Sequence, residues 1–288
     1  MKVKEVFEKS VQFLRERNIE SPRLEAELLV SSVLKTDRVG IYLKYEAPLT
    51  EIELSQLREL VVRKSKGEPT AYLLGEKYFF GRRFHVGPGV LIPRPETELI
   101  VEDVISYFRE NLVRIPARIA DLGAGSGCLG LTLGLEFPQS QVALVERSLQ
   151  AFEFCRKNLE TVIEEPQRSR FQIFHQDVEN WQASDAFDLV VANPPYIDPA
   201  DENVSSMVRK YEPNEALFSD DHGLADIKSW LLKLGEILSP KGITYFEIGH
   251  KQGPDVKKLF ESQNIFKAVE ILQDFNKKDR IIKAVKNG

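Results

Sequence analysis

The sequence predicts an α/β protein in which a small helical domain and a β-hairpin linker precede a doubly wound, mostly parallel sheet. Three observations lead to this fold class. The first part of the 288-residue chain has helical periodicity, two short aromatic runs and a Pro- and Gly-rich stretch follow, and from about Arg118 short β-type runs alternate with helical stretches. Such alternation is typical of parallel strands joined by crossover helices. We therefore divide the chain into residues 1–72, 73–96 and 97–288.

The first domain is expected to contain three helices. Apolar residues recur at helical spacing through residues 3–14, with charged residues between them. Pro22 stands where a second helix begins, since proline is favoured at the first helical position. Thr50 and Glu53 form the S/T-x-x-E capping box of a third helix, and Gly67 is placed to end it.

The linker begins with a predicted hairpin and continues as a stiff segment. The stretch "EKYFFGRRFHV" (76–86) has aromatic runs on both sides of Gly81, Arg82 and Arg83, which predicts two short strands joined at these residues. The following "GPGVLIPRPETE" (87–98) is dense in Pro and Gly, and this composition indicates a rigid rather than a flexible connection.

The remaining residues carry the strands of the doubly wound sheet. Helical patterns lie between most of these runs, as in residues 148–162 and 225–238. Only "NKKD" separates the last two runs, which is too short for a crossover helix, so we expect these two strands to pair antiparallel. The expected strands are "RIADLG" (118–123), "QVALVER" (141–147), "FQIFHQD" (171–177), "FDLVVANPPY" (187–196), "GITYFEIG" (242–249), "FKAVEILQDF" (266–275) and "RIIKAV" (280–285).

Composition excludes several classes of protein. The formal net charge is −5, from 39 basic and 44 acidic residues, which disfavours a protein that coats duplex nucleic acid. Cys128, Cys155 and the four histidines show no metal-ligand spacing, so no metal site is expected. The charged N-terminal stretch does not resemble a signal peptide, and no apolar run reaches the length of a membrane span. We expect a cytoplasmic protein with no membrane partner.

A glycine-rich loop, "DLGAGSGCLG" (121–130), leaves the first strand of the sheet and enters a helix. Gly123, Gly125 and Gly127 allow positive φ angles and close approach of a ligand to the backbone. In open α/β sheets, ligands bind outside the carboxyl ends of the strands, where this loop falls. Gly125, Gly127 and Gly130 also match G-x-G-x-x-G, the dinucleotide fingerprint. The loop therefore predicts a nucleoside-binding site, although a tight packing turn would explain the same glycines.

Acidic residues end the next two strands. Glu146 ends the second strand, where a carboxylate can accept hydrogen bonds from ribose hydroxyls. Asp177 ends the third strand and can meet an adenine amine, with Val178 against the ring. NAD and S-adenosylmethionine both contain adenosine, so these residues do not distinguish the two cofactors. A solvated strand end for Glu146 and an ordinary Asp turn for Asp177 are the structural alternatives.

The fourth strand ends abruptly in Asn193, Pro194, Pro195 and Tyr196. Proline cannot continue a sheet ladder, so these residues form a stiff turn. The lone pair of a planar amide or aromatic amine is delocalised, which makes this nitrogen a poor nucleophile. The Asn193 side-chain oxygen and the Pro194 carbonyl can accept its two N–H bonds, and Tyr196 can stack on the planar group. Together with the glycine loop, this turn indicates S-adenosylmethionine-dependent N-methylation, although Asn-Pro is also an ordinary turn initiator.

At these residues the chain resembles a known family, the HemK-type protein-(glutamine-N5) methyltransferases that modify peptide chain release factors. "NPPY" after "DLGAGSG" is similar to the wider group of amino-methyltransferases that have a seven-stranded sheet. "IPRPETE" combined with "NPPY" narrows the resemblance, which covers nearly the whole chain and is weakest over residues 1–65. Further similar stretches are "GEPTAYLLGEKYFFG" (67–81), "VLIPRPETE" (90–98), "YEPNEALFSDDHGL" (211–224), "FEIGHKQG" (246–253) and "DR" with "I" (279–281).

The resemblance implies a role for each part of the chain. The helical domain and hairpin would help to recognise a release factor, and its Gly-Gly-Gln glutamine would enter the pocket at the NPPY turn. The cofactor would be S-adenosylmethionine, with S-adenosylhomocysteine as the product. The methionine end would lie on Gly123, Ala124, Gly125, Ser126 and Gly127, the ribose on Glu146 and the adenine between Asp177 and Val178. The glutamine amide would bind Asn193, Pro194, Pro195 and Tyr196, with Asn193 counted among the cofactor contacts too. Arg94, Glu96 and Thr97 would shape the edge of the site, and capping of the helix "ETELIVEDVISYF" (96–108) explains the same residues equally well.

Three other functions are compatible with parts of the pattern. An N-methyltransferase that acts on adenine N6 of DNA or RNA would use the same chemistry but needs a basic channel, and no block dense in Arg or Lys is present, so no stable nucleic-acid partner is expected. A cofactor-binding regulatory module without turnover would not need the acceptor turn at Asn193. An NAD(P) oxidoreductase would share only the glycine loop and the acid.

Overall fold

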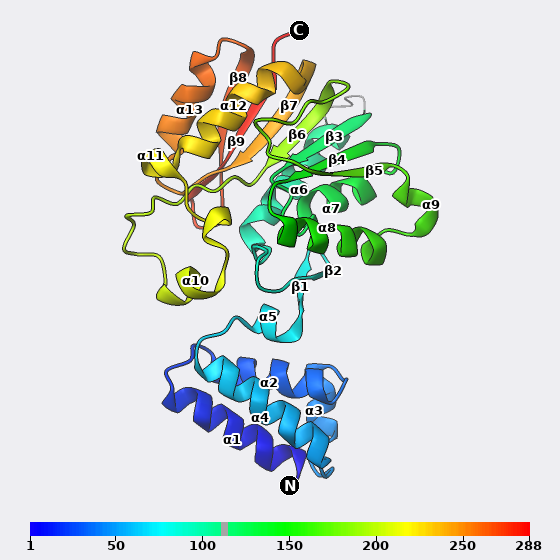
Figure 1. Ribbon diagram of the computed structural model, residues 1–288, viewed down its shortest axis with the longest axis vertical. Helices are drawn as coiled ribbons and strands as arrows, with labels where there is room; N and C mark the ends of the chain where they lie inside the picture. Colours follow the sequence, from blue (N-terminus) through cyan, green and yellow to red (C-terminus); the bar gives the residue numbers. More distant parts are fainter. Residues whose placement is uncertain (111–114) are drawn as a thin grey trace. The chain divides into compact units, whose positions relative to one another are not determined.

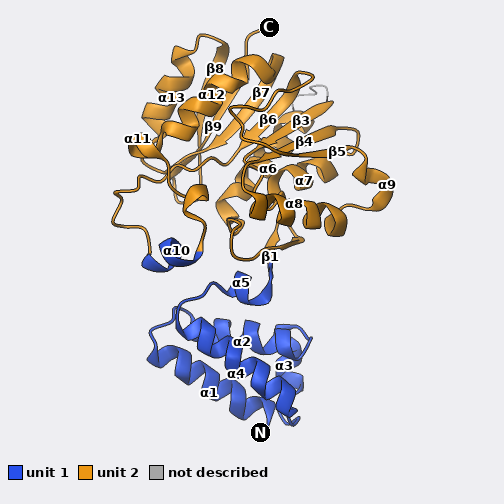
Figure 2. Cartoon of the chain, in the orientation of Figure 1, with its two compact units in different colours: residues 1–76, 206–211 blue, residues 77–205, 212–288 orange. Residues whose placement is uncertain are grey.

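The computed structural model describes residues 1–110 and 115–288 (Figure 1). These residues form two compact units (Figure 2), each described here by itself. Unit 1 comprises residues 1–76 and 206–211, and unit 2 comprises residues 77–205 and 212–288. Unit 1 is therefore discontinuous in sequence, because a short segment that follows the NPPY turn belongs to it.

Unit 1 is built from helices, and buried residues of the first four of them form one apolar core. The three expected helices are present as α1, α2 and α4, and Thr50 Oγ1 accepts the backbone N–H of Glu53 at 3.2 Å in the expected capping box. Gly67 follows α4 with a φ of +88°. The helices α3, α5 and α10 are too short to show a periodic pattern and were not expected. The bounds are α1 (Val3–Glu16), α2 (Pro22–Val33), α3 (Arg38–Leu43), α4 (Glu51–Ser65), α5 (Thr70–Leu74) and α10 (Ser206–Tyr211).

The expected hairpin consists of β1 (Glu76–Phe79) and β2 (Arg82–His85). Its turn lies earlier than the sequence pattern suggested, at Phe80 and Gly81, with φ values of +47° and +72°. Two-residue hairpin turns require such left-handed conformations. Arg82 and Arg83 are therefore not turn residues, as the pattern predicts, but the first residues of β2, because Phe80 rather than an arginine takes the left-handed position beside Gly81.

The sheet of unit 2 has seven strands in the order β5-β4-β3-β6-β7-β9-β8, which confirms the expected fold class. The strands β5, β4, β3, β6 and β7 run parallel, and β9 is antiparallel to both β7 and β8, as the short "NKKD" connection predicted for the last pair. The bounds are β3 (Arg118–Leu122), β4 (Gln141–Glu146), β5 (Phe171–His175), β6 (Phe187–Ala192), β7 (Leu238–Glu247), β8 (Phe266–Gln273) and β9 (Asp279–Lys286).

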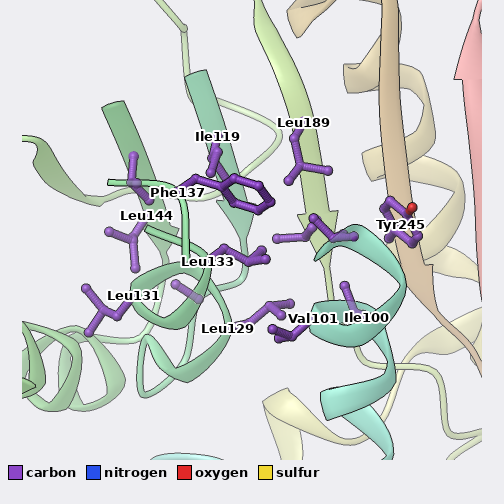
Figure 3. Packing of buried hydrophobic residues seen from close by; sticks show 14 of the residues in the cluster. Ile100, Val101, Ile119, Leu129, Leu131, Leu133, Phe137, Leu144, Leu189 and Tyr245 are labelled. Carbon is purple, nitrogen blue, oxygen red and sulfur yellow. The ribbon is translucent and has the colours of Figure 1, made fainter. Parts of the chain in front are cut away.

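Helices cover both faces of this sheet (Figure 1), because successive residues of the central strands point to opposite faces. Ile119 and Leu189 belong to the cluster shared with α6 and α7 (Figure 3), whereas Ala120 and Val190 pack with α12 and α13. The bounds are η1 (Pro95–Thr97), α6 (Glu98–Glu110), α7 (Cys128–Glu136), α8 (Leu149–Val162), α9 (Glu165–Arg168), η2 (Asn214–Ala216), α11 (Asp220–Gly223), α12 (Ala225–Ile237) and α13 (Gly253–Ser262). In the described parts of the chain, no helix has both the length and the apolar character needed to cross a membrane.

Candidate active site

The direction of the sheet order changes between β3 and β6. The strands β4 and β5 continue on one side of this pair and β7 on the other, so the loops that follow β3 and β6 diverge and open a crevice at the carboxyl ends of the strands. A cavity of about 890 Å³, including its open mouth, lies in this crevice. The glycine loop, the ends of β4 and β6, the residues after β5 and the Pro-rich linker all contribute to its lining.

The glycine loop covers the end of β3 and opens towards the cavity. Gly123 and Ala124 each donate a backbone hydrogen bond to the carbonyl of Val145 at 2.9 Å, and the N–H of Gly125 donates to Glu146 Oε2 at 2.7 Å. The φ of Gly125 is +56°, and a Cβ added there would meet only the Gly123 carbonyl, at 4.0 Å. The loop therefore leaves open space against its backbone, as a bound ligand requires.

Two buried carboxylates lie beside this loop. Glu146 accepts the backbone N–H groups of Gly125 and Ser148, both at 2.7 Å. Asp121 accepts the N–H of Gly130 at 2.8 Å. Burial raises the pKa of Glu146, and it raises the pKa of Asp121 to about 7. Because an ionised carboxylate has about four acceptor positions, Glu146 retains capacity for the two hydroxyls of a ribose.

Asp177 and Val178 line the cavity directly after β5. Val178 is buried, and Asp177 Oδ1 accepts the N–H of Glu179 at 3.0 Å. Arg147, which also lines the cavity, places Nη1 3.8 Å from Asp177 Oδ2 and donates from Nη2 to the carbonyl of Glu215 at 3.0 Å. This edge of the cavity thus combines an apolar wall with a carboxylate acceptor, which suits a purine that carries an exocyclic amine.

The NPPY turn leaves β6 at the other border of the crevice. Asn193 and Pro195 line the cavity. Asn193 Nδ2 donates to Thr97 Oγ1 at 3.3 Å, and the hydroxyl of Tyr196 donates to Glu247 Oε1 at 3.1 Å. Both polar side chains of the turn are therefore held by residues from other elements, Thr97 from η1 and Glu247 from the end of β7.

Glu247 is a buried carboxylate that joins these elements. It is 2% exposed, and its Oε2 accepts the hydroxyl of Thr97, itself 3% exposed, at 2.6 Å. The parallel register pairs Ala192 with Phe246, so that Asn193 and Glu247 follow at the same level of the two neighbouring strands. Burial raises the pKa of Glu247, whereas the hydroxyl groups that bind it act in the opposite direction.

The Pro-rich linker reaches the cavity through Arg94. Arg94 Nη2 donates to Glu212 Oε1 at 2.6 Å, and Glu212 Oε2 accepts the backbone N–H of Ile92 at 3.2 Å. Glu212 is 5% exposed, so one buried carboxylate fixes both the backbone and the charged side chain of the linker. Glu96 does not line the cavity, and its Oε1 lies 3.9 Å from Arg280 Nη2.

Gln252, which precedes α13, fastens the NPPY turn from a further side. Its Nε2 donates to the carbonyl of Tyr196 at 2.9 Å and to that of Gly223 at 3.4 Å. Ile197, which follows Tyr196, forms two backbone hydrogen bonds with the segment 217–219, at 3.0 and 2.9 Å. Stretches that are far apart in sequence therefore converge on the same turn.

Most of the predicted cofactor- and substrate-binding residues line the same cavity, and four do not. Gly127 is the N-cap of α7, where an added Cβ would lie 2.8 Å from Cys155 Sγ, and Glu96, Pro194 and Tyr196 also lie outside the lining. No local pattern indicated a role for Glu212, Glu247 or Gln252, although each stands in a stretch that carries the family resemblance. Within residues 1–110 and 115–288, no group of three or more His, Cys, Asp or Glu side chains could hold a metal ion. The predicted residues that line the cavity are Arg94, Thr97, Gly123, Ala124, Gly125, Ser126, Glu146, Asp177, Val178, Asn193 and Pro195.

The doubly wound seven-stranded sheet, with its glycine loop after β3 and Glu146 at the end of β4, has the fold and crevice of a nucleoside-binding enzyme, and the relatives described next assign the chain to the S-adenosylmethionine-dependent methyltransferases. A solved structure of the same fold is the T. thermophilus 16S rRNA N2 G1207 methyltransferase in complex with AdoMet and guanosine, with a TM-score of 0.53 and 23% identity over 74% of this chain and 50% of that chain. Two curated relatives are both named release factor glutamine methyltransferase. That of Geobacter sulfurreducens is 37% identical over 97% of this chain and 95% of its own length, and that of Chlorobaculum tepidum is 34% identical over 96% and 95%. The chain belongs to the release factor glutamine methyltransferase family.

Two family models match separate parts of the chain. The model described as the PrmC N-terminal domain matches residues 5–75, and the methyltransferase small domain matches residues 103–212. The first match falls within unit 1, and most of the second falls within unit 2.

Proposed function

We propose that this protein transfers a methyl group from S-adenosylmethionine to the side-chain amide nitrogen, N5, of the glutamine in the Gly-Gly-Gln loop of peptide chain release factors. One observation carries the proposal beyond family membership. Asn193 borders the same cavity as the glycine loop, and its Nδ2 is bound to Thr97 while its Oδ1 accepts no hydrogen bond from any residue that the structure describes. An acceptor for a substrate amide thus stands opposite the expected cofactor site.

The cavity residues fit the cofactor. The open space at Gly125 would take the methionine end, Glu146 has acceptor capacity for the ribose hydroxyls, and Asp177 with Val178 would hold the adenine. When bound, S-adenosylmethionine supplies a methyl group on a positively charged sulfur. The residues of this chain would contribute its placement, because the oriented backbone groups and carboxylates would hold it in one position.

The NPPY turn would activate the amide by orientation. Asn193 Oδ1 and the carbonyl of Pro194, which also accepts no hydrogen bond within the described residues, can take the two N–H bonds of the glutamine amide. These acceptors would direct the nitrogen lone pair at the methyl group and stabilise the positive charge that develops on nitrogen. As the N–C bond forms, the S–C bond breaks, and an amide proton then leaves to solvent. We assign Tyr196 to anchoring the turn through Glu247, because its ring is not part of the lining.

We propose that unit 1 recognises the release factor outside its glutamine loop. The match of residues 5–75 to the PrmC N-terminal domain supports this role. The short helix α3 also presents Val39 and Leu43 as exposed apolar side chains, which a protein partner can cover. Because release factors act in translation, we propose a cytoplasmic location for the enzyme.

The test is methyl transfer from labelled S-adenosylmethionine to a purified release factor. We expect label on the wild-type factor and none on a Gln→Ala variant of its Gly-Gly-Gln loop, on duplex DNA or on RNA. Asn193→Ala should reduce kcat by at least about 10²-fold, the scale of losing one preorganised polar group. Asn276→Ala, in the exposed turn between β8 and β9, is the matched control and should retain activity. Equal label on the Gln→Ala factor, or label on nucleic acid, would overturn the assigned substrate.

A further inference from the structure

The orientation of the Asn193 amide is itself determined by a chain of hydrogen bonds. The chain runs from Glu247 Oε2 to the hydroxyl of Thr97 at 2.6 Å, and from Thr97 Oγ1 to Asn193 Nδ2 at 3.3 Å. It joins the end of β7, the 3₁₀ helix of the linker and the end of β6. Because an amide presents a donor on one side and an acceptor on the other, the partner on the Thr97 side decides which of the two faces the substrate.

The hydrogen bonds that join Glu247, Thr97 and Asn193 can have only one donor-to-acceptor direction when Glu247 is ionised. A carboxylate can only accept, so Thr97 must donate its single hydroxyl proton to Glu247. The Thr97 oxygen is then left with lone pairs alone on the side of Asn193, and it must accept from Nδ2. The Asn193 oxygen consequently points away from Thr97, where it can accept an N–H of the substrate amide.

Glu247 acts on a second member of the turn at the same time. Its other oxygen, Oε1, accepts the hydroxyl of Tyr196 at 3.1 Å. The side chain of Glu247 is buried, so no water competes freely for these bonds, and buried polar networks of this kind hold a single arrangement. Both ends of the NPPY turn are thus tied to one carboxylate.

We propose that Thr97 and Glu247 are positioning residues that set the acceptor orientation of Asn193 for methyl transfer. The expected effect on kcat rests on the proposed function, whereas the hydrogen bonds from Glu247 through Thr97 to Asn193 do not depend on it. Thr97 and Glu247 would contribute little to the affinity for the cofactor or the release factor. Their contribution would be to kcat, because a flipped Asn193 amide would present its N–H groups to the N–H groups of the substrate.

The kinetic test replaces Thr97 by Val, which removes only the hydroxyl, and by Ser, which keeps it. We expect Thr97→Val to lower kcat about 10- to 100-fold, since misplacing a reacting group by about 1 Å costs about 10²-fold. The KM for the release factor and the Kd for S-adenosylmethionine should stay at the wild-type values, and Thr97→Ser should restore most of the rate. Thr244→Val is the matched control, because Thr244 is also buried on unit 2 and its hydroxyl has no partner among the described residues.

A double-mutant cycle distinguishes the orientation of Asn193 through Thr97 from a merely structural role of the two residues. The amide of Glu247→Gln can donate to Thr97, which frees the Thr97 proton to point at Asn193 and so reverses the chain. In the Glu247→Gln variant the Thr97 hydroxyl no longer holds the Asn193 amide in its acceptor orientation, so adding Thr97→Val should cause no further loss of kcat. If the two losses multiply instead, or if Thr97→Val turns over at the wild-type rate, the proposal is wrong.

A measurement without turnover keeps the test independent of the substrate assignment. The side-chain amide resonances of Asn193 can be identified by their absence from the spectrum of Asn193→Asp. We expect one of the two Asn193 amide protons to be protected from exchange with solvent in the wild type and in Thr97→Ser, and to lose that protection in Thr97→Val. Unchanged protection in Thr97→Val would refute the inference even if release factor methylation is confirmed, whereas a wild-type enzyme that labels no release factor would refute the proposed function alone.

Discussion

Replacing Gly223 by Ala should impair methyl transfer although Gly223 does not line the cavity. Gly223 has a φ of +81° and follows two residues, Asp221 and His222, that are also left-handed. A Cβ at this position would lie 2.2 Å from the carbonyl oxygen of Tyr196 and 2.8 Å from Gln252 Nε2. The first of these neighbours is backbone of the NPPY turn and cannot be avoided by a change of side-chain rotamer.

The size of the effect follows from this contact. The new Cβ and the Tyr196 oxygen must separate by at least about 0.8 Å to reach 3.0 Å, below which Cβ atoms are essentially never found. Gln252 and the backbone pairing of Ile197 restrain the same stretch, so the displacement falls on the turn that carries Asn193. A displacement of this order costs up to about 10²-fold in rate, and the left-handed conformation costs an alanine about 1–2 kcal/mol of stability.

The assay compares kcat for a release factor with the free energy of unfolding. Trp181 and Trp230 both belong to unit 2, so urea unfolding followed by tryptophan fluorescence reports on this unit. We expect Gly223→Ala to lose about 10²-fold in kcat while binding S-adenosylmethionine as the wild type does. Gly235→Ala is the matched control, because Gly235 lies exposed in α12 with no atom closer than 4.0 Å to an added Cβ, and it should raise stability by about 0.5–1 kcal/mol.

Gly81→Ala separates strain from collision. Gly81 has a φ of +72° but nothing within 4 Å of an added Cβ, so its loss of stability should reflect the left-handed conformation alone. Gly223→Ala should be less stable than Gly81→Ala by the additional cost of the collision. Wild-type kcat in Gly223→Ala, or an equal loss of kcat in Gly235→Ala, would show that the contact with Tyr196 does not position the turn.

Three further predictions concern other parts of the chain. Burial raises the pKa of Asp121 from 3.8 to about 7, so the folded state binds this proton more tightly than the unfolded chain. Between about pH 4 and about pH 8, the free energy of unfolding of the wild type, measured with urea, should therefore fall by up to about 4 kcal/mol more than that of Asp121→Asn. The same pH dependence in the two proteins would contradict this prediction. Glu212→Gln should lower the free energy of unfolding of unit 2 by about 1–3 kcal/mol, because Arg94 and the N–H of Ile92 lose a charged acceptor, and an unchanged denaturation midpoint would argue against that role. Thr50→Ala should destabilise α4 by about 1 kcal/mol through loss of its cap, visible as faster amide exchange in α4, with Thr50→Ser as the variant that must retain protection.

Local patterns in the sequence were sufficient for the class of fold and for the part of the cavity lined by the glycine loop and Glu146. The alternation of short apolar runs with helical stretches identified every strand of the sheet, and the four-residue gap after Phe275 identified the antiparallel pair. The glycine loop and Glu146 follow directly from strand ends, and the carboxyl ends of neighbouring parallel strands always meet at one edge of a sheet. Sequence position therefore implied spatial position for these residues.

The arrangement around the NPPY turn depended on contacts that no local pattern encodes. Thr97, Asn193 and Glu247 are far apart in the chain, and they meet because β6 and β7 are neighbours in register and the linker crosses their ends. The same is true of Glu212, which holds Arg94 across more than a hundred residues of sequence. The orientation of Tyr196 is also decided by such a contact, because its hydroxyl donates to Glu247, and its stacking role stays a prediction.

The sequence by itself determined which chemical groups the protein has and in which local geometry each of them starts, because helix caps, strand ends and proline turns depend on neighbouring residues. Only the tertiary structure decided which of these groups touch. A hydrogen-bond partner is selected by the pairing of strands and the path of loops, both of which arise from burying the two apolar clusters on either side of the sheet. The direction in which Asn193 turns its amide is the smallest feature decided in this way, and we expect methyl transfer to depend on it.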